Sequence, residues 1–204
     1  SEGLPEADIH VTGNTVIDAL QWVAARIAAS PEKSRLFAQM FSFLDPARRL
    51  ILVTGHRREN FGEGFRQICR AIKALAARKD VQVVYPVHPN PNVRSVTDAE
   101  LAGVNDVFLI DPLDYEPFVY LMQRASILLT DSGGVQEEGP SLGKPVLVMR
   151  EVTERPEAVT AGTVRLVGSD KGRIVEEVER LLDDAHAYEA MARAINPYGD
   201  GQAS

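Results

Sequence analysis

Six short apolar runs alternate with longer stretches along the chain, and this alternation limits the possible folds more than any other feature. The runs are residues 50–54, 81–87, 106–110, 126–130, 145–149 and 163–168. Aliphatic and β-branched residues dominate them without polar alternation, which is typical of strands that are buried on both faces. Such strands, separated by helices, predict an α/β fold with a doubly wound parallel sheet.

Amphipathic stretches between these runs predict the covering helices. Two sets of apolar residues follow the i, i+3, i+4, i+7 spacing of a helix: Phe65, Ile68, Cys69, Ile72, Leu75 and Ala76, and then Ile174, Val175, Val178, Leu181 and Leu182. Further helices are expected over residues 15–29, 34–43 and 113–125. The last should begin after Asp114 with Pro117 in its first turn. Core packing is the default role of Phe118 in that helix, and Cys69 should be a buried, inert thiol.

The two ends of the chain look different from the middle. Residues 1–49 are expected to hold a short strand at 9–13 and two helices that lie between domains, whereas residues 50–204 form one domain. The polar, turn-rich stretch 196–204 brings no closing element. Both ends suggest a piece of a larger protein.

Composition excludes several classes of partner. The 204 residues carry a net charge of −7 with a pI near 5.2, which disfavours nucleic acid or an anionic membrane surface as the main partner. No apolar run approaches the roughly 20 residues of a membrane span. A single cysteine permits no intrachain disulfide, which fits a reducing cytoplasm.

Common cofactor and metal signatures are not found in the sequence. The four histidines, His10, His56, His88 and His186, are far apart in the sequence and there is no cysteine cluster, so no metal site is predicted. Neither GxGxxG nor GxxxxGKS occurs, which weakens dinucleotide oxidoreductase and P-loop interpretations.

The stretch DSGGVQEEGP, which begins at Asp131, is the strongest candidate for ligand binding. It follows a predicted strand, and ligands of open parallel sheets bind at the carboxyl ends of the strands. Gly133 and Gly134 would let the backbone approach an anion, a helix from about Val135 would supply free amides, and Ser132 would add a hydroxyl. These features suit a phosphate.

Glu137 and Glu138 follow in what should be the first turn of that helix. A carboxylate repels phosphate but accepts hydrogen bonds from a ribose diol, so phosphate plus diol indicates a nucleotide. The alternative is a plain turn in which Ser132 caps the helix and both glutamates are solvated. The residues alone leave both interpretations open.

The loop GHRRENFGEGF, residues 55–65, brings His56, Arg57 and Arg58 to another strand end. These groups could neutralise a diphosphate. Alternatively, the arginines form a solvated ion-pair cluster with Glu59 and Glu63. The position of His56 at a strand end favours a role in the site.

Two further loops hold weaker candidates. His88 lies among three prolines in YPVHPNPNVR, a setting that is more often structural. Arg155, which precedes Pro156, could reach the same crevice, but surface pairing with its acidic neighbours is the alternative.

Together, TGHRRENFGEGF, YPVHPNP, residues 129–168 and NPYGDGQAS resemble the non-hydrolysing UDP-N-acetylglucosamine 2-epimerases. The resemblance runs from about His10 to Ser204. It implies a fold of the glycosyltransferase-B type, in which two Rossmann-like domains enclose the active site. The matched part would be the C-terminal, UDP-binding domain, and the N-terminal catalytic domain would be absent from this chain.

The resemblance also implies roles for individual residues. Ser132, Gly133 and Gly134 would hold the diphosphate, and Glu138 would hold the ribose hydroxyls. Phe118 would lie beside the uracil, Arg155 would complete the nucleotide site, and His56 would take part in catalysis at the diphosphate and sugar. Arg57 and His88 resemble positions that bind a second UDP-N-acetylglucosamine as an activator in bacterial members.

The reaction implied is elimination of UDP followed by re-addition after C2 is protonated on the opposite face. It interconverts UDP-N-acetylglucosamine and UDP-N-acetylmannosamine without a cofactor, in a cytoplasmic protein that is a homodimer at full length. The family's catalytic carboxylates would lie in the missing domain. The competing hypotheses are a UDP-sugar glycosyltransferase of the same fold, a hydrolysing epimerase, and a UDP-binding module without turnover.

Overall fold

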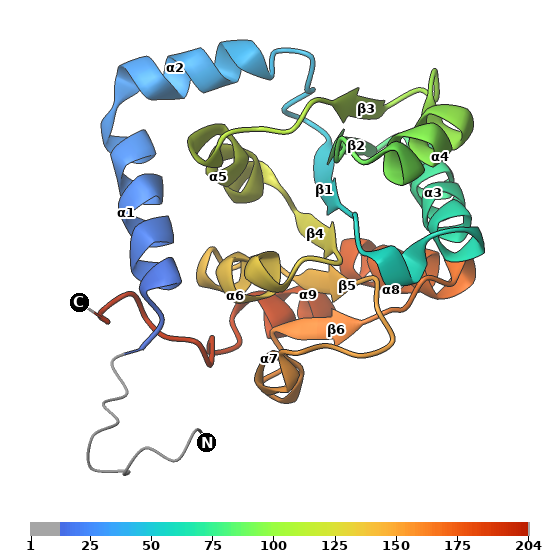
Figure 1. The fold of residues 1–204 in the computed structure, drawn as a ribbon. Coiled ribbons are helices and arrows are strands. Elements are labelled where there is room, and N and C mark those ends of the chain that lie inside the picture. Colours follow the sequence, from blue (N-terminus) through green and yellow to red (C-terminus); the bar gives the residue numbers. More distant parts are fainter. Residues whose placement is uncertain (1–12, 204) are drawn as a thin grey trace.

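A six-stranded parallel sheet forms the centre of the molecule in the computed structural model, which describes residues 13–203 (Figure 1). The strands are β1 (Arg49–Thr54), β2 (Val81–Pro86), β3 (Val107–Ile110), β4 (Ile127–Thr130), β5 (Val146–Val148) and β6 (Val164–Leu166). Their order in the sheet is β3-β2-β1-β4-β5-β6, and every neighbouring pair is parallel. All six predicted strands and the doubly wound topology are therefore confirmed.

The central strands are buried on both faces, as their apolar sequences predict. Along β1, Ile51 and Val53 pack into one core while Leu50 and Leu52 pack into the other. The edge strands differ from the prediction. Every residue of β3 is only partly buried and Arg165 of β6 is exposed, because an edge strand has a neighbour on one side only.

Helices cover both faces of the sheet (Figure 1). One face packs against α3 (Glu63–Ala76), α4 (Pro91–Leu101), α8 (Lys171–Asp183) and α9 (Ala185–Ala192). The other packs against α1 (Thr15–Ala29), α2 (Pro31–Met40), α5 (Tyr115–Arg124), α6 (Gly133–Ser141) and the short α7 (Pro156–Thr160), while a 3-10 turn, η2, spans Arg58–Asn60. The predicted α3, α5 and α8 are confirmed, and Cys69 is fully buried in α3 with its pKa raised by burial to about 12.

The corner between α1 and α2 lies slightly away from its predicted position. Helix α2 spans Pro31–Met40 rather than residues 34–43. The Ser30 hydroxyl accepts a hydrogen bond from the Lys33 amide at 3.2 Å, and Pro31 takes the first helical position, where its missing N–H costs nothing. The strand expected at residues 9–13 lies outside the described residues except for Gly13.

The polar stretch near the end of the chain is held against α1 and α6. The Asn196 side-chain amide donates to the Glu137 carbonyl at 2.9 Å and to the Ser141 hydroxyl at 2.6 Å. The backbone amide of Ala203 donates to the Asp18 carboxylate of α1 at 3.0 Å. Figure 1 shows this segment running from α9 back to the start of α1. Hydrogen bonds from two helices thus order a segment that has no helix or strand.

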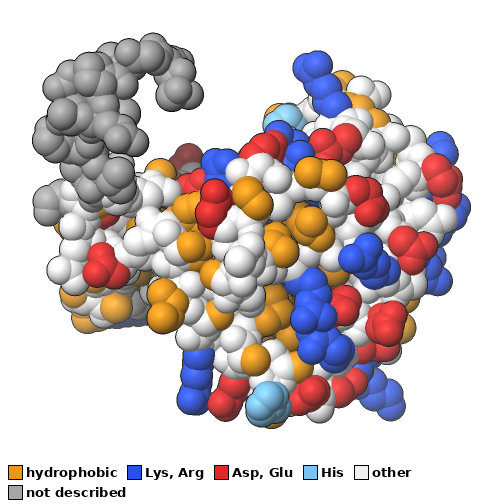
Figure 2. Space-filling model, turned by 90° about the horizontal axis from the view of Figure 1, so that it is seen from below, with side chains coloured by type: hydrophobic (Ala, Val, Ile, Leu, Met, Phe, Trp, Pro, Cys, Tyr) orange, Lys and Arg blue, Asp and Glu red, His pale blue; other side chains and the backbone are white. Residues whose placement is uncertain are grey.

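The surface carries charges of both signs. Figure 2 shows acidic and basic side chains interspersed with apolar ones over the face seen there. Among the described residues, no helix is long and apolar enough to cross a membrane.

Candidate functional site

A pocket of about 440 Å³ opens between the carboxyl ends of β1 and β2 and the start of α6. Its lining residues are Thr54, Gly55, His56, Pro86, His88, Pro89, Pro112, Tyr115, Phe118, Ser132, Gly134, Val135 and Glu138. We call it the Glu138 pocket. Strands β1 and β4 are neighbours at the point where the strand order reverses, which is where doubly wound sheets bind ligands.

The adjacent carboxylates Glu137 and Glu138 are both buried but have different partners. Glu138 lines the pocket, 7 % exposed, and accepts a hydrogen bond from the Tyr115 hydroxyl at 2.6 Å. Burial raises the pKa of Glu138, the Tyr115 hydrogen bond opposes that rise, and the charge of Glu137 adds to it. Burial and the neighbouring carboxylate also raise the pKa of Tyr115, so its hydroxyl stays a donor at neutral pH.

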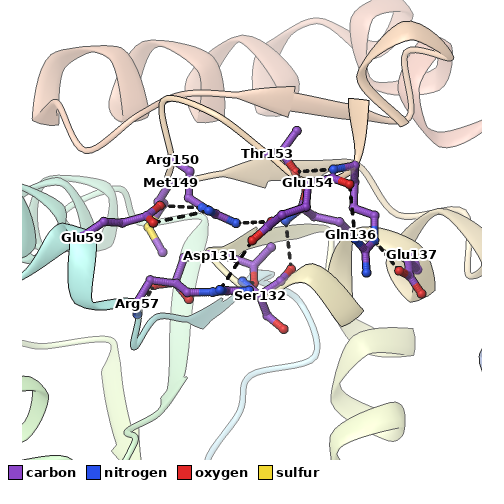
Figure 3. Close-up of polar contacts among 12 residues, drawn as sticks. Arg57, Glu59, Asp131, Ser132, Gln136, Glu137, Met149, Arg150, Thr153 and Glu154 are labelled. Carbon is purple, nitrogen blue, oxygen red and sulfur yellow. Dashed lines mark hydrogen bonds and ion pairs between the residues drawn. The ribbon is translucent and has the colours of Figure 1, made fainter. Parts of the chain in front are cut away.

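Glu137 contacts structural groups instead of lining the pocket. Its carboxylate, labelled in Figure 3, accepts a hydrogen bond from Nε of Arg155. It accepts another from the side-chain amide of Asn14 at 2.7 Å. It therefore joins α6 to the start of α1 and to the loop before α7.

The predicted place of the two carboxylates in the first turn of α6 was wrong. The helix begins at Gly133 rather than near Val135, so both lie in its second turn, and the first turn holds no acidic residue. The alternative in which both glutamates are solvated is also wrong, because each is at most 8 % exposed. The early start of α6, directly after Ser132, explains the first difference, and the contacts of the two carboxylates with Tyr115 and Arg155 explain the second.

The first turn of α6 has the features of an anion site. Ser132 occupies the N-cap position, but its side chain makes no capping hydrogen bond, so it does not serve the role assigned to it in the plain-turn alternative. A Cβ atom on Gly133 would lie 3.8 Å from Nη2 of Arg57 and 3.9 Å from Nη2 of Arg155. Nε of Arg57 is buried and has no hydrogen-bond partner. Two guanidinium groups therefore face a helix N-terminus that has free amides.

His56 and His88 form the wall of a second pocket. Their rings are stacked with centroids 5.1 Å apart and an interplanar angle of 17°. Beyond them lies another pocket of about 440 Å³, which we call the Arg58 pocket. It is lined by His56, Arg57, Arg58, Glu59, His88 and Asn90.

An ion-pair network supports the loops around these pockets (Figure 3). Arg150, only 8 % exposed, donates to Glu59 and to Glu154, with Nη2 of Arg150 3.3 Å from the Glu59 carboxylate. Glu154 also lies 3.6 Å from Nη1 of Arg57. The alternative for this loop, an ion-pair cluster of Arg57, Arg58, Glu59 and Glu63, does not form as such, because Glu59 pairs with Arg150 and Glu63 with Arg66 and Arg70.

Three comparisons with known proteins bear on this site. The sequence profile of the family described as UDP-N-acetylglucosamine 2-epimerase matches residues 1–204. UDP-N-acetylglucosamine 2-epimerase of Escherichia coli K12 is 60% identical over 203 residues, which are 99% of this chain and 54% of that protein. The crystal structure of UDP-GlcNAc 2-epimerase from Neisseria meningitidis bound to UDP-GlcNAc superposes with a TM-score of 0.93 at 49% identity, over 99% of this chain and 54% of that one.

The chain belongs to the UDP-N-acetylglucosamine 2-epimerase family. It spans about half the length of the curated relatives it matches. Its fold is of the glycosyltransferase-B type. Two glycosyltransferases share the fold at TM-scores of 0.53 and 0.58 with 21% and 16% identity, over 72% and 80% of this chain and 38% and 45% of theirs.

The structure of this epimerase-family chain brings the predicted residues together in two groups. The Glu138 pocket is lined by His56, Phe118, Ser132, Gly134 and Glu138, and also by His88. Gly133 lies at the start of α6, facing Arg57 and Arg155.

Arg57, which the resemblance places at the activator site with His88, has a position that differs most from this expectation. It lines the Arg58 pocket with His88, but its guanidinium also reaches α6.

The sequence did not single out Tyr115 or Asp131 as parts of the site. Tyr115 lies in the stretch LDYEP and holds Glu138, while Asp131 begins the DSGG turn and holds the backbone of His56 and Arg57. The position of Asp131 at a strand end was a usable signal. Tyr115 gave none, because its partner is 23 residues away. Among the described residues, no group of three or more His, Cys, Asp and Glu could hold a metal ion.

Proposed function

We propose that the protein to which this chain belongs interconverts UDP-N-acetylglucosamine and UDP-N-acetylmannosamine, and that this chain supplies the UDP-binding half. The observation that carries the proposal is the Glu138 pocket itself. It combines a helix N-terminus faced by two guanidinium groups with a buried carboxylate, which suit a diphosphate and a ribose diol respectively. The Neisseria relative bound to UDP-GlcNAc supports the same ligand class.

In this proposal the nucleotide lies along the start of α6. Ser132, Gly133, Gly134 and Arg155 bind the diphosphate. Glu138 accepts hydrogen bonds from the ribose hydroxyls, since Tyr115 uses only one of the acceptor sites of its carboxylate. Phe118, which is partly buried on the pocket wall, lies beside the uracil.

The proposed reaction breaks the bond between C1 of the sugar and the diphosphate while a proton leaves C2. UDP then adds back after C2 is protonated on the opposite face. This chain stabilises the negative charge on the departing diphosphate through the start of α6 and the arginines, while His56 acts at the diphosphate and sugar. The groups that remove and return the C2 proton are carboxylates in the half of the protein that the chain does not include.

The Arg58 pocket is proposed to take the second UDP-N-acetylglucosamine, the activator, with Arg57 and His88 as its ligands. The stacked imidazoles separate it from the substrate, so both ligands would contact the same two rings. We further propose a cytoplasmic, homodimeric full-length protein.

Calorimetric titration of this chain with UDP tests the nucleotide site. Glu138→Ala should weaken UDP binding about tenfold or more, because a charged hydrogen-bond acceptor is lost, and Ser132→Ala should weaken it about threefold. Glu176→Ala, which removes an exposed carboxylate of α8 outside the pocket, is the matched control and should leave the affinity unchanged. Unchanged affinity in both pocket variants would exclude this site.

Proton NMR of UDP-N-acetylglucosamine in heavy water tests whether this chain binds the nucleotide without removing the C2 proton. With this chain alone, the C2 proton signal should persist while the nucleotide resonances broaden on binding. Loss of the C2 signal would show that the base is in this chain. For the full-length protein, formation of the epimer without free UDP supports the epimerase; UDP plus a glycoside would indicate a glycosyltransferase, and UDP plus free N-acetylmannosamine a hydrolysing epimerase.

A further inference from the structure

Asp131 is a fully buried carboxylate at the end of β4 that none of the roles above uses. Its Oδ2 accepts hydrogen bonds from the backbone amides of His56 at 2.8 Å and Arg57 at 2.7 Å (Figure 3). Its Oδ1 is buried without a hydrogen-bond partner and lies 3.6 Å from Nδ1 of His56. One oxygen thus holds the loop, and the other faces the imidazole of the same residue.

We propose that Asp131 is the positioning residue of His56, holding the proton of the neutral imidazole on Nδ1 and leaving Nε2 free as an acceptor. This inference rests on the proposed function, in which His56 contacts the diphosphate and sugar. Asp131 itself does not line the pocket, so it acts only through His56.

The cost of an unpartnered buried oxygen supports this interpretation. A buried acceptor without a donor destabilises the fold, and Nδ1 of His56 is the donor that the structure places toward Oδ1. The separation of 3.6 Å is slightly beyond hydrogen-bond range, and such contacts often shorten once ligand is bound. Stacking on His88 further restricts the plane of the ring.

A purely structural role for Asp131 makes a different prediction about Asp131→Asn. In this variant the amide oxygen must take the place of Oδ2 to accept the two backbone hydrogen bonds. The amide NH₂ group then takes the place of Oδ1 and points a donor at Nδ1. The loop is kept, but Nδ1 becomes an acceptor and the proton of the neutral ring moves to Nε2.

Long-range proton–nitrogen correlation NMR of the ¹⁵N-labelled chain, at a pH where the ring is neutral, tests the proposal directly. The spectrum shows which imidazole nitrogen carries the proton, and His56→Asn identifies the His56 signals. The wild-type chain should show the Nδ1–H form and Asp131→Asn the Nε2–H form. Asp184→Asn is the matched control: Asp184 also accepts two backbone hydrogen bonds, from His186 and Ala187, and its substitution should leave the His56 signals unchanged.

An Nε2–H form in the wild-type chain would overturn the proposal, even if Asp131→Asn failed to fold. So would an unchanged His56 tautomer in a folded Asp131→Asn, because Asp131 would then only hold the loop. Titration with UDP separates this inference from the proposed function, since a chain with the expected tautomer that binds no UDP would refute only the latter. In the full-length enzyme, Asp131→Asn should lower kcat with little change in KM, and should add nothing to the loss in His56→Asn.

Discussion

The two pockets on either side of the His56–His88 stack have the same volume, about 440 Å³, but different walls. The Glu138 pocket is lined mainly by glycine, proline and aromatic residues, with one carboxylate, beside a helix N-terminus. The Arg58 pocket is lined by two arginines, a glutamate and an asparagine besides the histidines. The first offers directed backbone and carboxylate contacts, whereas the second offers mainly charged side chains.

The different linings predict different selectivity for ligands in the two pockets. A site built from a helix N-terminus and a buried carboxylate suits the shape of the proposed nucleotide, because its groups are fixed before ligand arrives. A site lined by charged side chains, one of them the exposed Arg58, attracts any phosphate and holds it less selectively. The shared imidazoles are the only side chains that line both pockets among the described residues, so substitutions there should affect both.

The largest expected effect is at the shared wall. In the full-length protein, His56→Asn should reduce turnover about 10²- to 10⁴-fold with a modest change in UDP affinity, because the imidazole acts on the reacting groups more than on the nucleotide. Steady-state kinetics and calorimetry measure the two quantities. His186→Asn, on the exposed end of α9, is the control. Near-normal turnover in His56→Asn would remove His56 from the mechanism.

Substitutions of the two arginines of the Arg58 pocket should differ in their effect on UDP affinity. Arg57→Gln should weaken UDP binding to this chain about tenfold, since the guanidinium reaches Gly133 at the start of α6. Arg58→Gln should change UDP affinity less than about twofold, because Arg58 lines only the second pocket. Calorimetry of both variants against UDP measures the difference. Equal UDP affinities of the two variants would show that Arg57 contributes only to the Arg58 pocket.

The raised pKa of Glu138 should make UDP binding depend on pH. In the proposed site the carboxylate form of Glu138 accepts ribose hydroxyls, so the affinity for UDP should fall severalfold as the pH falls through that raised pKa. The loss should begin above the ordinary glutamate value of 4.5. Glu138→Gln should remove this acid limb. If the pH dependence of UDP affinity in Glu138→Gln still shows the acid limb, another group is responsible for it.

The smallest effect concerns stability and compares Glu138 with its neighbour. A carboxyl whose folded-state pKa is raised stabilises the fold below its unfolded pKa, and this contribution is lost as the pH rises through the folded-state value. At neutral pH, Glu138→Gln should therefore raise the Tm by a few degrees. Glu137→Gln should lower the Tm, because Arg155 and Asn14 lose a charged partner. The free energy of unfolding should fall by roughly 1–2 kcal/mol. If thermal unfolding shows a change in Tm of the same sign for both variants, the two carboxylates do not have the different roles described.

Most of the fold was predictable because the signals were local. The apolar runs and the helical spacing identified all six strands and the helices α1, α2, α3, α5, α6 and α8, but not α4, α7 or α9. The edge position of β3 was not predictable in this way, because its sequence is as apolar as that of a central strand, and in β6 only Arg165 departs from the apolar pattern. Position in the sheet is set by pairing between distant segments.

The candidate site was predictable in part. The glycine turn, His56 and Glu138 were identified because they follow strands, and parallel strands bring their carboxyl ends to one edge. The stacking of His56 on His88 was not predictable, since the two residues lie in separate loops and only the pairing of β1 with β2 brings those loops together. The same holds for the contact between Tyr115 and Glu138.

The sequence by itself determined the α/β class, the place of the glycine turn and the pair of adjacent carboxylates, because strand and helix periodicity and turn chemistry are properties of short segments. The tertiary structure decided which carboxylate enters the pocket. Neighbours on a helix point in directions about 100° apart, and the point at which α6 begins set Glu138 toward Tyr115 and Glu137 toward Arg155. It also left one oxygen of Asp131 buried beside His56, which no local pattern could indicate.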